Sequence, residues 1–430
     1  MQIDVVGDTV CALVTATALA QTGHQVRLLL MPSMVADEVI AGRLPFHEPG
    51  LDRILDEQRA VGRLTVLTAD QAESLALSDV LFIALQAGEK DVALELTRRQ
   101  AASHQRPLLV NQSVFPVGTS EEMQLAQDEA GAQGAVVAFP DTLQDGQAWV
   151  GFVRPDHILL GCETEWAEAL VRELLRPFNR RRDVIQVMSR REAEFAKLAI
   201  SGMLATRVSF MSDMALLAEE LDVDIEKVRQ AMAEDPRIGD AYLYPGCGFG
   251  GPGFSRDVMS LSSALHQRNS SARLLDEVML INERQKEVLF RKFWRFFNCQ
   301  VQGRAVAIWG GAFKPATNRI QNAPSLALIE ALLAQGVLIR IYDPMALEPL
   351  SSHFSGRSGI EFCADAYQAL EGVDALMLVT EWKEFWSPDW TELKRRMRTP
   401  LIIDGRNIYD PGFLARSGFR YSGIGRGEAI

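Results

Sequence analysis

The segment QIDVVGDTVCALVTATALAQTG (residues 2–23) decides the fold class, because a strand-like run passes directly into a helix-like one. The apolar run IDVV is typical of a buried strand, and the residues that follow carry apolar side chains at helical spacing up to a stopping glycine. The same alternation continues through QVRLLLM, LFIAL, PLLVNQS and GAVVAF. Strands that alternate with helices predict a parallel sheet with right-handed crossovers. We therefore expect a Rossmann-like α/β domain over residues 1–187.

Two further regions follow along the chain. Residues 188–298 are rich in Ala, Leu, Glu, Arg and Met without a strand-like run, so we expect a central helical region. Within it, residues 272–297 could form one helix of about seven turns, of the kind that bridges domains or builds a dimer interface. The alternating pattern resumes with RAVAIWG, VLIRIYDP, ALMLVTEW and LIIDGRN, which predicts a second α/β domain over residues 299–430.

Composition excludes several classes of function. No run of eighteen or more apolar residues exists in the 430, so we expect no membrane span. The formal net charge of −12 disfavours non-specific nucleic-acid binding. An odd number of cysteines without metal-ligand spacing argues against disulfides and zinc, and a cytoplasmic protein without a metal is expected. The five cysteines are Cys11, Cys162, Cys247, Cys299 and Cys363.

The turn after the first strand lies where a dinucleotide fold carries GxGxxG. Gly7 keeps the first glycine, but Thr9 and Ala12 occupy the second and third positions. A branched Thr9 stands where the pyrophosphate would lie. Leu30, at the end of the second strand, replaces the acid that binds the ribose hydroxyls. These four residues predict a Rossmann fold with an eroded cofactor motif.

Three other stretches carry groups that suit ligand binding, and each also has a purely structural interpretation. Glu194, Lys197 and Ser201 share one helix face, although a lone lysine there is usually solvated. The loop GCGFGGPGFSRD (246–257) suits close backbone approach to a sugar or phosphate, or a tight connection. The stretch WGGAFKPATNRIQNAPS (309–325) predicts a strand, a glycine turn and a helix start, where a phosphate can bind.

Taken in order, these pieces resemble the UDP-glucose/GDP-mannose dehydrogenase family over essentially the whole chain. The matching pieces are FHEPGLD (46–52), PVGT (116–119), RPDHILLG (154–161), AEFAKLA (193–199), DPRIG (235–239), GFGG (248–251), AFKP (312–315), VTEW (379–382) and IIDGRNIYD (402–410). The resemblance implies an NAD-binding domain, a long central helix that forms a homodimer, and a nucleotide-sugar-binding domain. Family members oxidise C6 of the sugar twice, from alcohol to carboxylate, with two NAD and a cysteine thiohemiacetal.

The departures from the family pattern fall on the reacting groups. The loop that the family writes GFGGxCFPKD reads GFGGPGFSRD here, so Gly253 stands at the nucleophile position and Arg256 at that of the lysine. Ser201 replaces an asparagine and Val114 a threonine. The remaining changes are the shortened acids Asp141 and Asp145, the loss of the nicotinamide loop in IALQAGEKD, and Gln321 in place of an arginine.

The resemblance carries over the remaining site residues by position. It implies catalytic roles for Lys197 and Asp257, and it places Arg237 at an arginine that the family supplies from the partner chain. The implied substrate-binding positions are Arg237, Phe249, Gly250, Phe313, Lys314, Arg406 and Asp141. DPRIG favours a UDP-type ligand over GDP-mannose, while Gln321 and Tyr244 weaken any choice of substrate.

Together these features predict a catalytically inactive family member. Glycine has no nucleophile, so the aldehyde cannot be held for a second oxidation, and Cys247 lies six residues away on the other side of the GFGG turn. Because several cofactor-binding groups are missing at once, we expect no micromolar binding of NAD. Residual nucleotide-sugar binding would then serve a regulatory or structural role in polysaccharide synthesis. The alternatives are an active NAD-dependent sugar-nucleotide oxidoreductase and an interaction protein whose cleft is empty.

Overall fold

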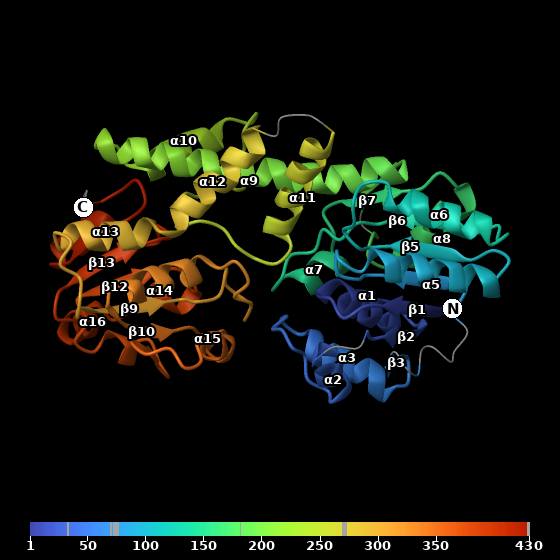
Figure 1. The fold of residues 1–430 in the computed structure, drawn as a ribbon, viewed down its shortest axis with the longest axis horizontal. Helices are drawn as coiled ribbons and strands as arrows, with labels where there is room; N and C mark the ends of the chain where they lie inside the picture. Colours follow the sequence, from blue (N-terminus) through green and yellow to red (C-terminus); the bar gives the residue numbers. More distant parts are fainter. Residues whose placement is uncertain (32–33, 69–70, 72–76, 181, 269–272, 428–430) are drawn as a thin grey trace. The chain divides into compact units, whose positions relative to one another are not determined.

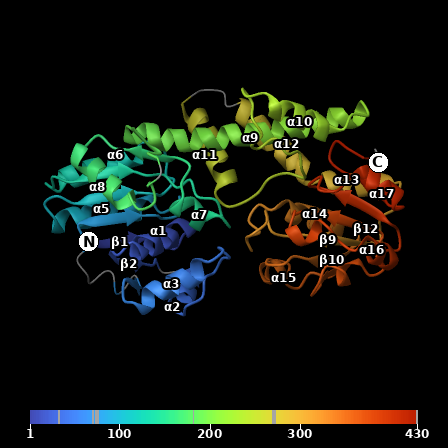
Figure 2. The ribbon, with the colours of Figure 1, turned by 180° about the vertical axis from the view of Figure 1, so that it is seen from behind.

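A computed structural model describes residues 1–31, 34–68, 71, 77–180, 182–268 and 273–427 (Figures 1 and 2). The chain folds into two compact units, Met1–Ile200 and Ser201–Ile430. Each unit is built on one sheet, as the alternating sequence pattern predicts, and each is described by itself below.

The sheet of the first unit confirms the Rossmann-like prediction. Its strands are β1 (Gln2–Val6), β2 (Gln25–Leu29), β3 (Leu64–Leu67), β4 (Val80–Ile83), β5 (Leu108–Asn111), β6 (Ala135–Ala138), β7 (Ile158–Gly161) and β8 (Ile185–Met188). Their order is β3-β2-β1-β4-β5-β6-β7-β8. The pairs are parallel except that β7 runs antiparallel to β6, with Ala138 opposite Gly161, so a purely parallel sheet was the wrong prediction at this one junction.

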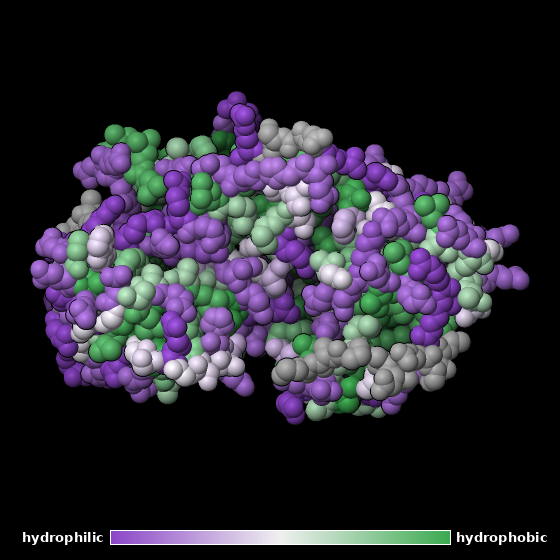
Figure 3. Space-filling view, in the orientation of Figure 1, coloured by the Kyte–Doolittle hydropathy of each residue, from purple (hydrophilic) through white to green (hydrophobic). Residues whose placement is uncertain are grey.

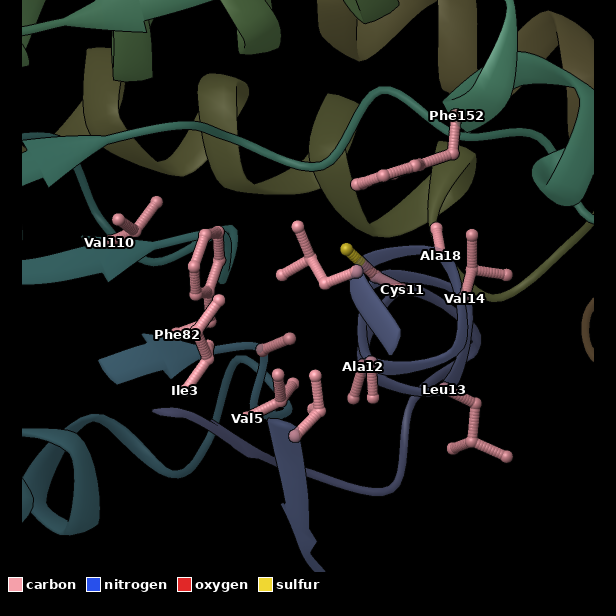
Figure 4. Close-up of a cluster of buried hydrophobic side chains, with 14 of the residues drawn as sticks. Ile3, Val5, Cys11, Ala12, Leu13, Val14, Ala18, Phe82, Val110 and Phe152 are labelled. Atoms are coloured by element: carbon pink, nitrogen blue, oxygen red, sulfur yellow. The ribbon is translucent and has the colours of Figure 1, made fainter. Parts of the chain in front are cut away.

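Helices cover both faces of this sheet, which explains why its strands are apolar runs rather than alternating ones. The helices of the unit are α1 (Val10–Gln21), α2 (Met34–Ile40), α3 (Leu51–Ala60), α5 (Lys90–Ser103), α6 (Thr119–Glu129), α7 (Ala148–Val153) and α8 (Glu165–Leu175). Side chains of α1, α3, α7 and α8 share one core with the sheet, and those of α5 and α6 share another. Figure 4 shows Cys11, Ala12 and Leu13 of α1 among Ile3, Val5 and Phe82 of the sheet.

The central region is helical, as predicted. The helix α9 (Arg190–Glu220) has 31 residues and continues from the first unit into the second. It is followed by α10 (Ile225–Glu234), α11 (Phe254–Gln267), α12 (Arg273–Lys286) and α13 (Val288–Phe296). The single helix expected over residues 272–297 is wrong, because the backbone of Glu287 (φ −97°, ψ −1°) separates α12 from α13.

The second unit carries a six-stranded parallel sheet. Its strands are β9 (Ala305–Trp309), β10 (Leu338–Tyr342), β11 (Ile360–Phe362), β12 (Ala375–Leu378), β13 (Leu401–Asp404) and β14 (Arg420–Ser422), in the order β11-β10-β9-β12-β13-β14. The remaining helices are α14 (Pro324–Ala334), α15 (Leu347–His353), α16 (Trp390–Arg396), α17 (Pro411–Arg416) and the short 3₁₀ turns η1 (Gln368–Leu370) and η2 (Lys383–Phe385). The second Rossmann-like sheet is therefore confirmed.

One face of this sheet packs against α13 and α14, and the other packs against α16 and α17. Trp309, at the end of β9, is 1% exposed and stacks on Phe385 with ring centroids 4.9 Å apart. Among the helices that the structure describes, none is long and apolar enough to cross a membrane.

Candidate active site

The turn between β1 and α1 keeps the backbone of a dinucleotide fold but not its open helix start. Gly7 has φ +136°, and a Cβ placed on it would lie 2.2 Å from the carbonyl oxygen of Ala84, so only glycine fits there. Thr9 caps the helix: its hydroxyl accepts a hydrogen bond from the N–H of Ala12 at 3.1 Å and donates one to the Ala84 oxygen at 2.8 Å. The Thr9 side chain therefore satisfies one amide of the first helical turn.

The end of β2 is apolar. Leu30 is 1% exposed, so it offers no acceptor for a ribose hydroxyl. A cavity of about 590 Å³ beside it is lined by the apolar Leu29, Leu30, Met31, Val92 and Leu96, and also by the charged Asp91, Glu95 and Arg99 of α5. Thr9 therefore caps the first turn of α1 with its own hydroxyl, and Leu30 places a buried apolar side chain directly after β2.

Two of the predicted site residues of the first unit lie close to a buried thiol. Burial raises the pKa of the Cys11 thiol well above its ordinary range, the carboxylate of Asp141 raises it further, and the charge of Lys197 opposes this shift. Asp141 also accepts a hydrogen bond from the N–H of Leu143 at 2.9 Å. The structure therefore gathers Asp141 and Lys197 near the start of α1, while Val114 is half-buried in the loop that precedes α6.

Glu194 has a defined structural task on α9. Its carboxylate accepts hydrogen bonds from the N–H groups of Gly118 at 2.6 Å and Ser120 at 2.9 Å. These amides belong to the start of α6, where a carboxylate also meets the favourable end of the helix dipole. The PVGT segment is thus fixed to α9 one turn before Lys197, so Glu194 positions the backbone around the predicted catalytic lysine.

In the second unit, the glycine loop 246–251 is held on two sides. Asn282 of α12 accepts a hydrogen bond from the N–H of Phe249 at 2.8 Å and donates one to its carbonyl at 3.1 Å. On the other side, the N–H of Gly251 donates to the carbonyl of Gln321 at 2.8 Å. A Cβ on Gly250 would lie 2.4 Å from the carbonyl oxygen of Asn322, so the close approach requires glycine.

The same loop packs against Phe313, one of the predicted substrate-binding residues. A Cβ on Gly251 would lie 2.8 Å from the Phe313 ring, and the Lys314 ammonium lies 5.8 Å from the centre of that ring. The glycine loop that carries Phe249 and Gly250 therefore lies beside the segment that carries Phe313 and Lys314.

Helix α11 begins directly after this loop, at Phe254, three residues before Asp257. Gly253 is its N-cap residue with ordinary helical dihedrals (φ −85°, ψ −52°), so the backbone does not require glycine at this position. Asp257 is 1% exposed, and its carboxylate accepts a hydrogen bond from the Ser201 hydroxyl at 3.1 Å. Arg256 approaches the other oxygen of Asp257 at 3.3 Å.

Arg406 and Cys247 join the loop to the sheet. Arg406 Nε donates to the carbonyl of Val379 at 2.7 Å, and Nη1 lies 3.3 Å from the carbonyl of Gly248. Cys247 is 1% exposed, with its sulfur 3.8 Å from the Val379 oxygen, and burial raises the pKa of its thiol. The buried sulfur therefore lies against the sheet, next to the end of β12.

The turn after β9 was expected to present free amides to a phosphate. Asp343 instead accepts hydrogen bonds from the N–H groups of Gly311 at 2.7 Å and Ala312 at 3.0 Å. The phosphate-binding interpretation is therefore wrong for these two amides, because a carboxylate of the protein already uses them. Arg237 lies apart from the loop contacts, with its side chain 85% exposed and paired with Asp235 at 2.7 Å.

Comparison with known proteins agrees with this arrangement along the whole chain. The descriptions that match are the UDP-glucose/GDP-mannose dehydrogenase family NAD binding domain over residues 1–179, the central domain over 191–284 and the UDP binding domain over 307–411. The chain belongs to the UDP-glucose/GDP-mannose dehydrogenase family. In this family the N-terminal domain implies use of NAD and the C-terminal domain implies a nucleotide-sugar ligand.

Individual relatives span the same length. A UDP-glucose 6-dehydrogenase of Pseudomonas aeruginosa is 40% identical over 446 residues, which cover 100% of this chain and 98% of the relative. A UDP-glucose 6-dehydrogenase of Rhizobium meliloti is 31% identical, and the match covers 99% of this chain and 100% of the relative. The structure of a UDP-glucose dehydrogenase from Pyrobaculum islandicum superposes with a TM-score of 0.86 at 27% identity, covering 99% of this chain and 97% of that one.

Three residues that fix backbone segments within their own units were not identified from the sequence. They are Asn282, Asp343 and Glu48. The buried Glu48 carboxylate accepts hydrogen bonds from Gly146 and Trp149 at 2.7 and 3.0 Å. Burial raises the pKa of Glu48, although these backbone amides oppose the shift. Glu48 lies inside the matched piece FHEPGLD, which was the only signal that pointed to it.

Proposed function

We propose that this chain is a nucleotide-sugar-binding member of its family that does not carry out the double oxidation. The observation that carries this proposal is Gly253 at the start of α11, where the family pattern has its nucleophilic cysteine. A glycine cannot form the thiohemiacetal, so an aldehyde at C6 is not held for a second hydride transfer. Cys247 does not take over this role, because its sulfur is buried against the carbonyl of Val379.

The cofactor side supports the same proposal. Thr9 uses the amide of Ala12, and Leu30 places an apolar side chain where the ribose hydroxyls need an acceptor. A missing hydrogen bond to a charged acceptor costs about 1.5–3 kcal/mol, and a second missing one on the same ligand adds to it. We therefore propose that NAD does not bind this chain at micromolar concentrations, and we place no hydride transfer in its function.

The glycine loop 246–251 supports the nucleotide-sugar part of the proposal. Asn282 and Gln321 fix the glycine loop from two sides, so its backbone is preorganised for a bound molecule. We propose that Phe249, Gly250, Phe313, Lys314 and Arg406 contact a UDP-type sugar nucleotide. Lys197, Asp141 and Asp257 retain the positions of catalytic and sugar-contacting groups without the reaction that they served.

The central helix supports a homodimer. Met203, Phe210 and Leu217 repeat every seven residues along α9 and are 63%, 48% and 47% exposed. Seven-residue spacing places them on one face of the helix, as in helices that pair. Hydrophobic side chains also gather over α10 and the adjoining end of α9 in Figure 3. We propose that this face of α9 packs against a second copy of the chain. We also propose that Arg237 of one copy contributes to the nucleotide-sugar site of the other.

The biological role follows by analogy with active relatives. We propose a cytoplasmic dimer that regulates or scaffolds polysaccharide synthesis by binding the nucleotide sugar used there. Within it, residues 1–187 would form the NAD-type domain, 188–298 the dimerisation region and 299–430 the nucleotide-sugar-binding domain.

Substitution at Gly253 tests this function. The wild-type chain should bind UDP-glucose in calorimetry and form no NADH when NAD is added. Gly253→Cys should fold, because in the described part of the chain a Cβ at this position meets Arg256 Nη2 alone, at 3.9 Å. It should still form no NADH, since the cofactor positions remain unchanged. Gly253→Ala is the matched control, which adds the Cβ without the thiol.

Two results would overturn the proposal. NADH formation by the wild-type chain would establish the alternative, an active oxidoreductase. Turnover restored by Gly253→Cys but not by Gly253→Ala would show that NAD binds after all and that only the nucleophile was missing.

A further inference from the structure

The space beside Gly253 is open on the side where a side chain would project. Among the residues that the structure describes, a Cβ built on Gly253 has a single neighbour within 4 Å outside its own chain neighbours, Nη2 of Arg256 at 3.9 Å. Residue 253 follows the loop glycine Gly251 by two positions. A molecule held by the loop therefore has room at Gly253 for one more group, next to a guanidinium.

Two polar groups in the first turn of α11 have no hydrogen-bond partner in the described part of the chain. Arg256 is about two-thirds buried, with its side chain 33% exposed. Its Nε is buried, and among the residues that the structure describes no acceptor meets it. The Ser255 residue is 3% exposed, and its hydroxyl likewise has no partner in the described part of the chain. Buried polar groups without partners are uncommon in native proteins, and each leaves free energy to be gained by an acceptor.

The neighbouring carboxylate does not satisfy this guanidinium. Asp257 Oδ1 lies 3.3 Å from Arg256 Nη2, which is long for a charge-assisted hydrogen bond. The other oxygen of Asp257 accepts from Ser201. Since a guanidinium has five N–H donors, this single printed contact leaves the fork able to pair with a second acceptor.

We infer that this space takes a carboxylate at the terminal carbon of the sugar, so that the chain prefers a nucleotide uronate over the neutral sugar nucleotide. This inference rests on the proposed function, because the nucleotide must be bound first. A carboxylate is planar and offers two oxygens, which match the fork of Arg256 in a bidentate pair. A primary alcohol at the same carbon offers one neutral oxygen and cannot pair in this way.

Two other features favour the anion over the alcohol. The first turn of α11, a helix of 14 residues, directs its free N–H groups and the positive end of its dipole toward this space. With glycine at position 253, no side chain competes for the volume that the second carboxylate oxygen needs.

Calorimetry on the full chain with UDP, UDP-glucose and UDP-glucuronate tests the inference. We expect UDP-glucuronate to bind about ten-fold tighter than UDP-glucose. Arg256→Gln should remove this preference and leave the affinity for UDP unchanged. Arg268→Gln, at the exposed opposite end of α11, is the matched control and should keep the preference.

A second variant tests the inference independently, in case Arg256→Gln does not fold. Gly253→Val fills the open volume and should weaken UDP-glucuronate more than UDP-glucose, with the circular-dichroism spectrum unchanged. Equal affinity of the wild-type chain for the two sugar nucleotides, or a preference that survives Arg256→Gln, would overturn the inference alone. Absence of UDP binding to the wild-type chain would instead overturn the proposed function.

Discussion

The hydroxyl of Thr9 donates a hydrogen bond to the carbonyl oxygen of Ala84 at 2.8 Å. The same hydroxyl accepts from the N–H of Ala12, so one side chain closes the start of α1 and ties it to the segment after β4. In a dinucleotide fold this is where the backbone approaches the pyrophosphate. The Thr9 hydroxyl thus caps the helix two residues after Gly7, which has φ +136°.

Removal of this cap should loosen the first turn of α1. Thr9→Ala removes the acceptor of the Ala12 amide, which costs about 1 kcal/mol of local stability. Hydrogen exchange followed by mass spectrometry should therefore show exchange about five-fold faster in the first turn. Thr22→Ala, at the other end of the same helix, should leave that turn unchanged. Unchanged protection in Thr9→Ala would contradict the capping role.

Asn282 should control the shape of the glycine loop. Asn282→Ala removes both hydrogen bonds to Phe249, and leaving buried backbone groups unpaired costs about 1–3 kcal/mol each. We expect UDP-glucose to bind at least about ten-fold more weakly in calorimetry. Asn282→Asp keeps an acceptor for the Phe249 N–H and should lose less affinity than the alanine variant. Equal affinity of the wild-type chain and Asn282→Ala for UDP-glucose would show that the shape of the glycine loop does not affect ligand binding.

One thiol should react quickly in the native chain. Cys299 is exposed, while Cys11, Cys162, Cys247 and Cys363 are buried. Burial raises the pKa of each of these four thiols, which lowers their thiolate fraction at neutral pH. Titration with a coloured disulfide reagent should show one fast thiol, which is lost in Cys299→Ser. A fast phase that is lost in Cys247→Ser would mean that Cys247 reaches solvent and can act as a nucleophile.

The exposed face of α9 should hold the dimer together. Phe210→Glu combined with Leu217→Glu places two charges on the apolar stripe, and buried unpaired charges oppose association strongly. Sedimentation velocity should show a dimer for the wild type and a monomer for this variant. Leu125→Glu, on the exposed face of α6, is the control and should remain dimeric. A dimer that survives both changes on α9 would contradict this interface.

Secondary structure could be predicted from the sequence wherever it depends on one local segment. The apolar runs of β1 and β9 predict both sheets because each is followed directly by a glycine turn. The reversal of β7 escaped prediction, since hydrophobic patterns do not encode strand direction. The break at Glu287 also escaped, because no proline or glycine marks it and only the backbone angles reveal it.

The candidate site shows the same division. Thr9, Leu30 and Gly253 are local replacements within recognisable motifs, so these departures from the family pattern are visible in the sequence itself. Asn282 and Asp343 act on backbone groups about thirty residues away in the chain, and no local pattern identifies such partners. Arg256 was recognised as a substitution, but its unpartnered Nε became evident only from burial and contacts within the described part of the chain.

Calorimetric titration of the purified chain with NAD tests most directly the claim that the redox function has been lost. Because Thr9 and Leu30 remove binding groups at two points of the same ligand, we predict no saturable binding up to several millimolar NAD. The variant Thr9→Gly with Leu30→Asp should gain measurable affinity if these two positions are the cause. Saturable binding of NAD to the wild-type chain at micromolar concentration would contradict the claim and establish a working cofactor site.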